Sequence, residues 1–166
     1  MKNLYILRHA KSDWSEEFKS DFERGLSKRG FNDILLVAKE LKKKGLKIDL
    51  IVSSSAKRAK ITAEIFGAIL GYDIFEINFK KKLYLANKED ILQTIKSTNS
   101  NINNLLIVGH NPEFTELVNH LTNLNLDNLP TSGFVGVKLD INSWDKIKKG
   151  KSSIYLTPKM LKNRPL

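Results

Sequence analysis

Two histidines of the chain each follow an apolar run that is typical of a buried strand. His9 comes after Arg8 at the end of the run Asn3–Leu7, and His110 follows the run Leu105–Val108 after one glycine. A neutral imidazole is a nucleophile available near pH 7, because the unperturbed pKa of histidine is about 6.5. Either histidine alone would be typical of a hydrogen-bonded structural residue, but their matching positions favour one shared site.

Two arginines supply the charge that a phosphoryl group requires. Arg8 adjoins His9, and Arg58 lies one helical turn after the apolar run Leu50–Val52. Guanidinium groups bind phosphate oxygens bidentately and remain charged. The helix expected after each strand also turns unpaired N–H groups towards the same place. This set of residues therefore predicts a site for a doubly charged oxyanion.

A metal site is the main alternative for the two histidines. Such a site needs a third or fourth ligand, and two arginines would repel a divalent cation. The remaining histidine, His120, lies in a helix predicted over Pro112–Leu124, where it is expected to face solvent or to cap the helix. No convergent carboxylate is evident in the sequence. We therefore expect no metal and no cofactor.

Alternating strand and helix signals must position these residues. The three apolar runs are typical of buried strands, and apolar residues recur between them at helical spacing. Two such helices are marked by the sets Phe31, Ile34, Leu35, Ala38, Leu41 and Ile61, Ile65, Phe66, Ile69, Leu70. The order predicts an α/β fold with a mainly parallel sheet and helices on both faces. Ligands gather at the carboxyl ends of the strands in such sheets, so the site residues should share one edge.

The helix ends and the last third of the chain add detail to this expectation. Ser27 is a plausible N-cap for the first helix, while Gly45 and Gly71 are expected to end the first and second helices. In the last third, Val135, Val137, Leu139 and Ile141 alternate with other residues, and Ser153–Leu156 resembles a partner strand. The pattern predicts an added C-terminal edge strand or hairpin. We expect residues 1–166 to form one domain.

Composition narrows the classes of function. The chain has 166 residues, no cysteine and a formal net charge of +10. The absence of cysteine excludes disulfides and thiol nucleophiles, and it agrees with a cytoplasmic location. The apolar stretch before Arg8 is too short for a signal peptide, and no run approaches a membrane span.

The positive charge comes mainly from lysine clusters. Nucleic-acid binding is one interpretation of these clusters, but no interleaved aromatic residues or nucleic-acid-binding module accompany them. We therefore interpret them as solvated helix ends and loops whose field could attract an anionic substrate. The clusters are Lys42–Lys44, Lys80–Lys82, and Lys146 with Lys148, Lys149 and Lys151.

In their order, these motifs resemble the histidine phosphatase superfamily, in particular its short SixA-like phosphohistidine phosphatase branch. The resemblance spans essentially the whole chain, although Gly25 and Ser55 stand where the branch commonly has proline. The matching segments are LYILRHAKSDW from residue 4, DFERGLSKRG from residue 21, SSAKRA from residue 54 with TAE from residue 62, LYLA from residue 83, VGHNP from residue 108, PT from residue 130 and LTPK from residue 156.

The resemblance implies a phosphoglycerate mutase-like fold and a metal-independent phosphatase with a phosphohistidine enzyme intermediate. By this resemblance His9 is the nucleophile, and Arg8, Arg58 and His110 bind the phosphoryl group. Ser12, Asn111 and Glu89 are secondary candidates. A protein without turnover that only binds phosphate is an alternative, but binding alone would not require His9.

The proton donor of the larger family members has no clear counterpart. Glu89 and Asp90 occupy the corresponding region, but we expect them in the first turn of a helix that contains Ile91 and Ile95, where the helix dipole favours acids. An alcohol leaving group needs a proton, whereas imidazole is a much weaker base. This difference favours phosphohistidine on a protein, such as a phosphorelay or phosphocarrier protein. The alternative is a phosphomonoesterase for small-molecule or phosphoseryl substrates.

The chain has no long insertion that could cover a bulky metabolite, which also favours a protein substrate. We expect the protein to act as a monomer, without a nucleic-acid or membrane partner.

Overall fold

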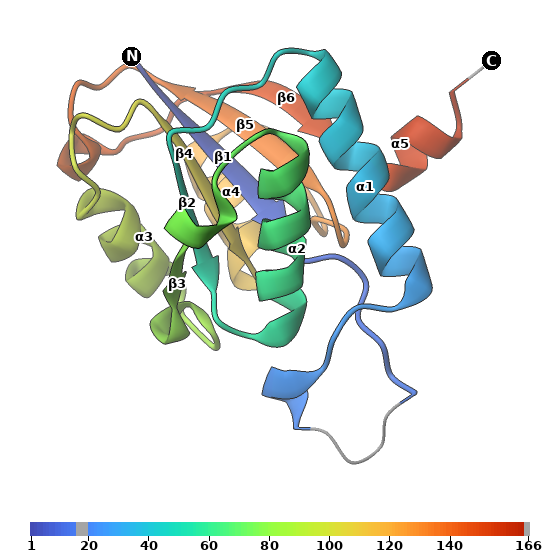
Figure 1. Cartoon of the computed structure of the whole chain (residues 1–166). Coiled ribbons are helices and arrows are strands. Elements are labelled where there is room, and N and C mark those ends of the chain that lie inside the picture. The colour runs from blue at the N-terminus through green and yellow to red at the C-terminus, as the bar shows by residue number, and fades with distance from the viewer. Residues whose placement is uncertain (16–19, 165–166) are drawn as a thin grey trace.

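A six-stranded sheet runs through the middle of the computed structural model, which describes residues 1–15 and 20–164 (Figure 1). The strands lie in the order β3-β2-β4-β1-β5-β6. β1, β2, β3 and β4 pair in parallel, whereas β5 is antiparallel to both β1 and β6. The mainly parallel sheet and its added C-terminal strands were predicted and are confirmed. The strands are β1 Lys2–Arg8, β2 Leu50–Ser54, β3 Asn78–Lys80, β4 Asn104–Gly109, β5 Phe134–Leu139 and β6 Lys151–Leu156.

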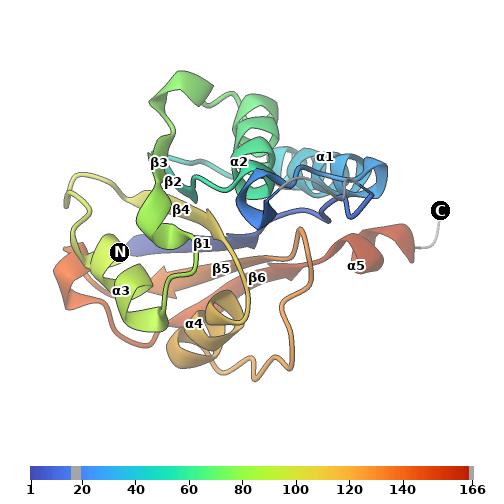
Figure 2. The ribbon, with the colours of Figure 1, turned by 90° about the horizontal axis from the view of Figure 1, so that it is seen from below.

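Helices cover both faces of the sheet, as Figure 2 shows in a view along its edge. α1 and α2 lie on one face, and α3 and α4 lie on the other. The short helix α5 follows β6 and lies beside α1. The helices are α1 Lys28–Lys43, α2 Lys57–Ile69, α3 Lys88–Lys96, α4 Glu113–Leu121 and α5 Pro158–Lys162, with 3-10 turns η1 Asp21–Glu23, η2 Ile74–Glu76, η3 Lys81–Leu83 and η4 Trp144–Lys146.

The middle residues of the central strands are apolar, as is expected where both faces of a sheet are covered. In β1, Leu4 and Ile6 join the cluster beneath α3 and α4, while Tyr5 and Leu7 join the cluster beneath α1 and α2. Successive side chains of a strand point to opposite faces, so an uninterrupted apolar run packs into the hydrophobic clusters on both faces of the sheet. The short runs in the sequence therefore predicted the central strands correctly.

The ends of the first two helices also follow the sequence. The Ser27 side chain accepts a hydrogen bond from the N–H of Gly30 and so caps α1. Gly45 and Gly71, which follow α1 and α2, have φ angles of 80° and 77°, in the left-handed region that favours glycine. α4 ends at Leu121, so the expected helix to Leu124 was too long.

The register brings the ends of three strands to the same level. Arg8, the last residue of β1, lies beside Gly109 of β4, and Val108 of β4 lies beside Ser53 of β2. His9, His110 and Ser54 follow directly after these paired positions. Among the described residues, no helix is long and apolar enough to span a membrane.

The loop after His9 packs closely against the start of α1, and Gly30 makes this approach possible. A Cβ at Gly30 would overlap the backbone carbonyl oxygen of Lys11. That oxygen also accepts hydrogen bonds from the N–H and the hydroxyl of Ser27.

We therefore expect Gly30→Ala to lower the free energy of unfolding by about 2 kcal/mol, because the overlap involves backbone that cannot move aside cheaply. Urea denaturation measures the change. Lys28→Ala, an exposed substitution in the first turn of the same helix, is the matched control. Equal stability of both variants would contradict the packing argument.

Candidate active site

The two histidines lie side by side beyond the ends of β1 and β4. Their ring centroids are 5.2 Å apart, and His9 is only 6% exposed. Arg58, at the start of α2 after β2, is also 6% exposed. The predicted residues Arg8, His9, Arg58 and His110 are thus placed together at the carboxyl edge of the sheet.

A backbone carbonyl fixes the protonation of the His9 ring. Nδ1 of His9 lies 2.7 Å from the carbonyl oxygen of Ala10. A carbonyl oxygen only accepts, so Nδ1 must carry the proton and Nε2 keeps its lone pair. The Ala10 N–H is held by the hydroxyl of Thr62, at 2.9 Å, and this hydroxyl donates to the carbonyl oxygen of Arg58. The loop that orients His9 is therefore fastened to α2.

His110 is oriented by a serine at the end of β2. Its Nε2 lies 2.8 Å from the hydroxyl oxygen of Ser54, which already accepts the N–H of Ala56. The hydroxyl hydrogen is therefore available to Nε2, an arrangement that leaves the proton on Nδ1. Nδ1 is buried and has no hydrogen-bond partner among the described residues. An acceptor oxygen of a ligand would satisfy it.

Arg8 carries a charge without an acidic partner in the described part of the chain. One terminal nitrogen donates to the carbonyl oxygen of Leu129 at 3.0 Å, but its buried Nε has no hydrogen-bond partner. Burial lowers the pKa of Arg8, and the nearby charge of Arg58 lowers it further. Leaving a buried N–H unpaired is costly, so the site favours an anion that binds there.

Arg58 is anchored by a residue whose role the sequence did not reveal. Its guanidinium donates to the backbone oxygen of Asp21 at 2.7 Å and to the Asp21 carboxylate at 3.0 Å. The hydroxyl of Tyr84 donates to the same carboxylate oxygen at 2.5 Å, and Arg24 donates to the other oxygen at 2.6 Å. The Tyr84 ring also meets His110 edge-on, with centroids 5.6 Å apart.

The only sequence signal for Asp21, Ser54, Thr62 and Tyr84 was their occurrence in matching motifs. Their roles depend on contacts between segments far apart in the chain, so spacing alone could not assign them.

The secondary candidates are placed differently. The side chain of Asn111 stabilises the surrounding loops: it donates hydrogen bonds to Asn128 and Leu129 and accepts from Thr115. Ser12 is buried in an isolated bridge to Leu26. The structure shows no contact that brings either residue to the reacting group.

The two acids after Tyr84 belong to the start of a helix. Glu89 is exposed in the first turn of α3, and Asp90 forms a capping box with Asn87. This placement agrees with the expectation from the sequence. His120, also as expected, is exposed on α4.

Burial and positive charge keep both site histidines neutral. Burial lowers the pKa of His9 to about 3, and the neighbouring charges of His110, Arg8 and Arg58 act in the same direction against the Ala10 hydrogen bond. Burial also lowers the pKa of His110 to about 4, assisted by the charge of Arg58. An unprotonated Nε2 on His9 is therefore present throughout the neutral range.

A metal ion would need a different set of side chains. Within residues 1–15 and 20–164, no group of three or more histidine, cysteine, aspartate or glutamate side chains could hold one.

An α/β sheet whose carboxyl edge presents a neutral histidine near two arginines is suited to bind a phosphoryl group. The sequence profile described as "Histidine phosphatase superfamily (branch 1)" matches residues 4–83. This match covers just under half of the chain; together with the structural similarity to SixA proteins described below, it supports a SixA-like phosphatase of the histidine phosphatase superfamily.

Similar proteins agree with this assignment. The proposed phosphohistidine phosphatase SixA from Agrobacterium tumefaciens superposes with a TM-score of 0.81 and 27% identity, over 95% of this chain and 98% of that chain. An uncharacterized chloroplastic protein of Arabidopsis thaliana is 29% identical over 87% of this chain and 70% of its own length. A phosphoserine phosphatase candidate from Hydrogenobacter thermophilus is 40% identical, over only 43% of this chain and 35% of its own length.

The neutral histidines make stability depend on pH. Below about pH 6.5 the unfolded chain protonates both imidazoles, whereas the folded protein resists protonation of His9 and His110 until about pH 3 and 4. The unfolded state therefore binds more protons in this window, and the free energy of unfolding falls as the pH falls.

For each histidine the fall is about 1.4 kcal/mol per pH unit in that window. When the pH falls from 6.5 to 4.5, the free energy of unfolding should fall less in His9→Asn than in the wild type. We expect the two decreases to differ by about 2–3 kcal/mol. Denaturant titrations at several pH values measure this difference. His120→Asn, the replacement of an exposed histidine, is the control. An unchanged slope in His9→Asn would contradict a neutral buried His9.

Asp21 should matter to catalysis as a positioning residue. We expect Asp21→Ala to lower kcat/KM about tenfold to a hundredfold, because Arg58 and Tyr84 lose a charged acceptor. Asp21→Asn should recover part of this loss, since an amide oxygen still accepts.

Steady-state kinetics on an aryl phosphate measure the effect, with the exposed Asp145→Ala as control. Wild-type kinetics in Asp21→Ala would rule out the positioning role.

Proposed function

We propose that this phosphatase removes phosphoryl groups from phosphohistidine on proteins, through a phosphoenzyme intermediate on His9. One observation carries the proposal. The unprotonated Nε2 of His9 shares a site with two buried donors, Arg8 Nε and His110 Nδ1, that lack partners among the described residues. A nucleophile beside unsatisfied donors is what phosphoryl transfer requires, because the reacting oxygens carry the charge.

In the first step, the lone pair of His9 Nε2 attacks phosphorus. The bond between phosphorus and the substrate nitrogen breaks, and its electron pair leaves with the substrate imidazole. The phosphorylated His9 ring becomes positively charged, and the carbonyl oxygen of Ala10 stabilises the charge through Nδ1–H. Forming this covalent intermediate divides the hydrolysis into two easier displacements.

In the second step, water attacks phosphorus from the side that the substrate has left. The P–Nε2 bond breaks, its electrons return to His9, and both protons of the water stay with the phosphate, which leaves as H2PO4−. Arg8, Arg58 and His110 bind the equatorial oxygens in both steps. The anchored guanidinium of Arg58 needs no reorganisation as charge develops.

The acidic residue next to the site is unsuited to protonate a leaving group. Asp21 accepts hydrogen bonds from Tyr84, Arg58 and Arg24. The hydrogen bond from Tyr84, above all, lowers the pKa of Asp21, and Arg58 adds to this effect despite partial burial. Its carboxylate therefore stays ionised. A leaving group that departs without strong acid assistance, such as imidazole, fits this site better than an alkoxide.

The alternative is a phosphomonoesterase for small-molecule or phosphoseryl substrates on the same scaffold. The partial match to the phosphoserine phosphatase candidate favours this alternative, although it covers only 73 residues.

We also propose that no metal ion takes part, since two arginines supply the positive charge that phosphoryl transfer requires. Residues 1–166 would act as one domain and as a monomer. A protein substrate agrees with the phosphohistidine phosphatase description of the Agrobacterium protein.

The nucleophile is tested by trapping the intermediate. We expect rapid acid-free quenching after incubation with an aryl phosphate to show base-stable, acid-labile phosphate on His9, by mass spectrometry of peptides. His9→Ala should lose both the phosphorylated peptide and at least a thousandfold in kcat. His120→Ala is the control. Undiminished turnover in His9→Ala would refute the proposed mechanism, and a requirement for added zinc or magnesium would refute metal independence.

The substrate class is tested by a direct comparison. We expect kcat/KM on a phosphohistidine protein to exceed that on a sugar phosphate by at least a hundredfold, because the sugar alkoxide lacks a proton donor. Phosphate release from both substrates at equal enzyme concentration measures the ratio. A preference for the sugar phosphate would establish the phosphomonoesterase instead.

A further inference from the structure

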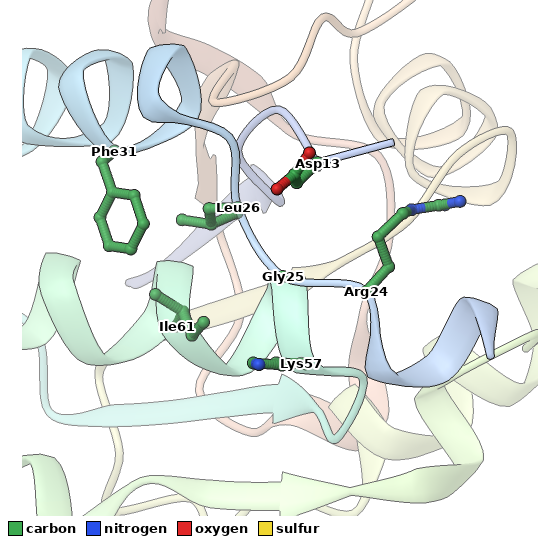
Figure 3. Close-up of a pocket in the computed structure, with 7 residues that line it drawn as sticks. All are labelled: Asp13, Arg24, Gly25, Leu26, Phe31, Lys57 and Ile61. Carbon is green, nitrogen blue, oxygen red and sulfur yellow. The ribbon is translucent and has the colours of Figure 1, made fainter. Parts of the chain in front are cut away.

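A small pocket opens between α1, α2 and the loop after His9 (Figure 3). Its volume is about 160 Å³. Three apolar side chains, Leu26, Phe31 and Ile61, form one part of its wall, and the charged residues Arg24, Lys57 and Asp13 form another. We call this space the side pocket.

The side pocket shares residues and contacts with the phosphoryl site. Lys57 precedes Arg58 in α2, so the first turn of this helix contributes a residue to the side pocket and one to the phosphoryl site. Arg24 donates to Asp21, whose other carboxylate oxygen accepts from Arg58. The hydrogen-bonded side chains of Arg24, Asp21 and Arg58 therefore lie between the side pocket and the phosphoryl site.

The apolar part of the side pocket is open to solvent. Phe31, in the first turn of α1, is 41% exposed. In Figure 3 its ring points towards Ile61 across the space. Gly25 leaves this space clear, since a Cβ there would lie 3.4 Å from Cε of Lys57. An apolar side chain of about leucine size would fill the space and remove apolar surface from water.

Among the described residues that line the side pocket, two are cations, and of these Arg24 is paired with Asp21 while Lys57 is not. The ammonium group of Lys57 makes no ion pair with any described residue, and Arg24 stacks on the 71% exposed ring of Trp14, with its Cζ 3.4 Å from the ring centroid. Asp13 is the one acid among the described residues that line the space. An occupant with a carboxylate beside its apolar group would complement these charges.

We propose that the side pocket binds an apolar side chain next to an acidic residue, both belonging to the phosphohistidine protein that the active site dephosphorylates. The proposal rests on the proposed function. Because Arg24, Asp21 and Arg58 form a hydrogen-bonded chain between the phosphoryl site and the side pocket, an occupant of both places must extend beyond the phosphohistidine residue. The side pocket therefore makes a protein segment a better substrate than the phosphorylated amino acid.

Synthetic phosphohistidine peptides test this proposal. In one series, a Leu-Asp or Asp-Leu pair moves one residue at a time along an otherwise polar peptide, and Ser-Asn replaces the pair in matched peptides. We expect one spacing to raise kcat/KM about tenfold over its Ser-Asn match, which corresponds to burying a leucine side chain.

Two variants and their controls connect the preference to the side pocket. Phe31→Ser and Lys57→Gln should each reduce the ratio between the Leu-Asp and Ser-Asn peptides to near one. The controls are Leu36→Ser, which removes a 37% exposed apolar group from the same helix, and Lys60→Gln, which removes an exposed cation from α2. Both controls should keep the wild-type ratio, and Phe31→Ser should keep the wild-type rate on an aryl phosphate.

The outcomes separate the two proposals. Equal turnover of all the peptides, with normal turnover of the aryl phosphate, would overturn the side-pocket proposal alone. A preference that persists in Phe31→Ser and Lys57→Gln would also overturn it, because the peptide would then bind elsewhere. Absence of phosphate release from every phosphohistidine peptide would overturn the proposed function and the role of the side pocket with it.

Discussion

The positive charge gathered at the carboxyl edge of the sheet is the constraint that organises this site. Arg8 and Arg58 are close enough for the charge of one to lower the pKa of the other, and both are at least half-buried. One carboxylate, Asp21, is bound to Arg58, so the two guanidinium groups are only partly compensated. A doubly charged phosphoryl group would neutralise the remaining positive charge of the two guanidinium groups. The folded state is therefore suited to bind such a group.

Burial, assisted by the same charge, determines the protonation state of the histidines. Loss of hydration disfavours the protonated imidazoles most, and the two arginines disfavour them further, so the folded protein holds His9 and His110 neutral. For His9 the neutral form leaves a lone pair on Nε2, the nitrogen that we propose attacks phosphorus. For His110 it leaves a single N–H to donate. Neither residue holds a spare proton for the leaving group, and the ionised Asp21 holds none either. These electrostatics support the proposed preference for a leaving group of low basicity.

The sequence predicted the residues whose positions depend on local pattern. Arg8, His9 and His110 follow apolar runs, and parallel strands in register carry them to one edge. Asp21 could not be placed in the same way, because its contact with Arg58 joins residues 37 positions apart, and its contact with Tyr84 joins residues 63 positions apart. β3 escaped prediction since three residues, none of them fully buried, leave no periodic signal. The end of α4 was placed too late because the extended Thr122 interrupts a pattern that stays apolar to Leu124.

The lysine clusters, similar in sequence, differ in their relation to this edge. Lys42 and Lys43 occupy the last turn of α1, where the helix dipole favours cations, and the cluster after β5 lies at the opposite edge of the sheet. Lys80–Lys82 instead follow β3 at the carboxyl edge, and Lys81 lies over the ring of Phe22 in η1. Screening confines a surface charge to within about 10 Å. Among the described residues, this cluster, Lys57 and Arg24 therefore contribute more to the field at the carboxyl edge than the lysines at the opposite edge do.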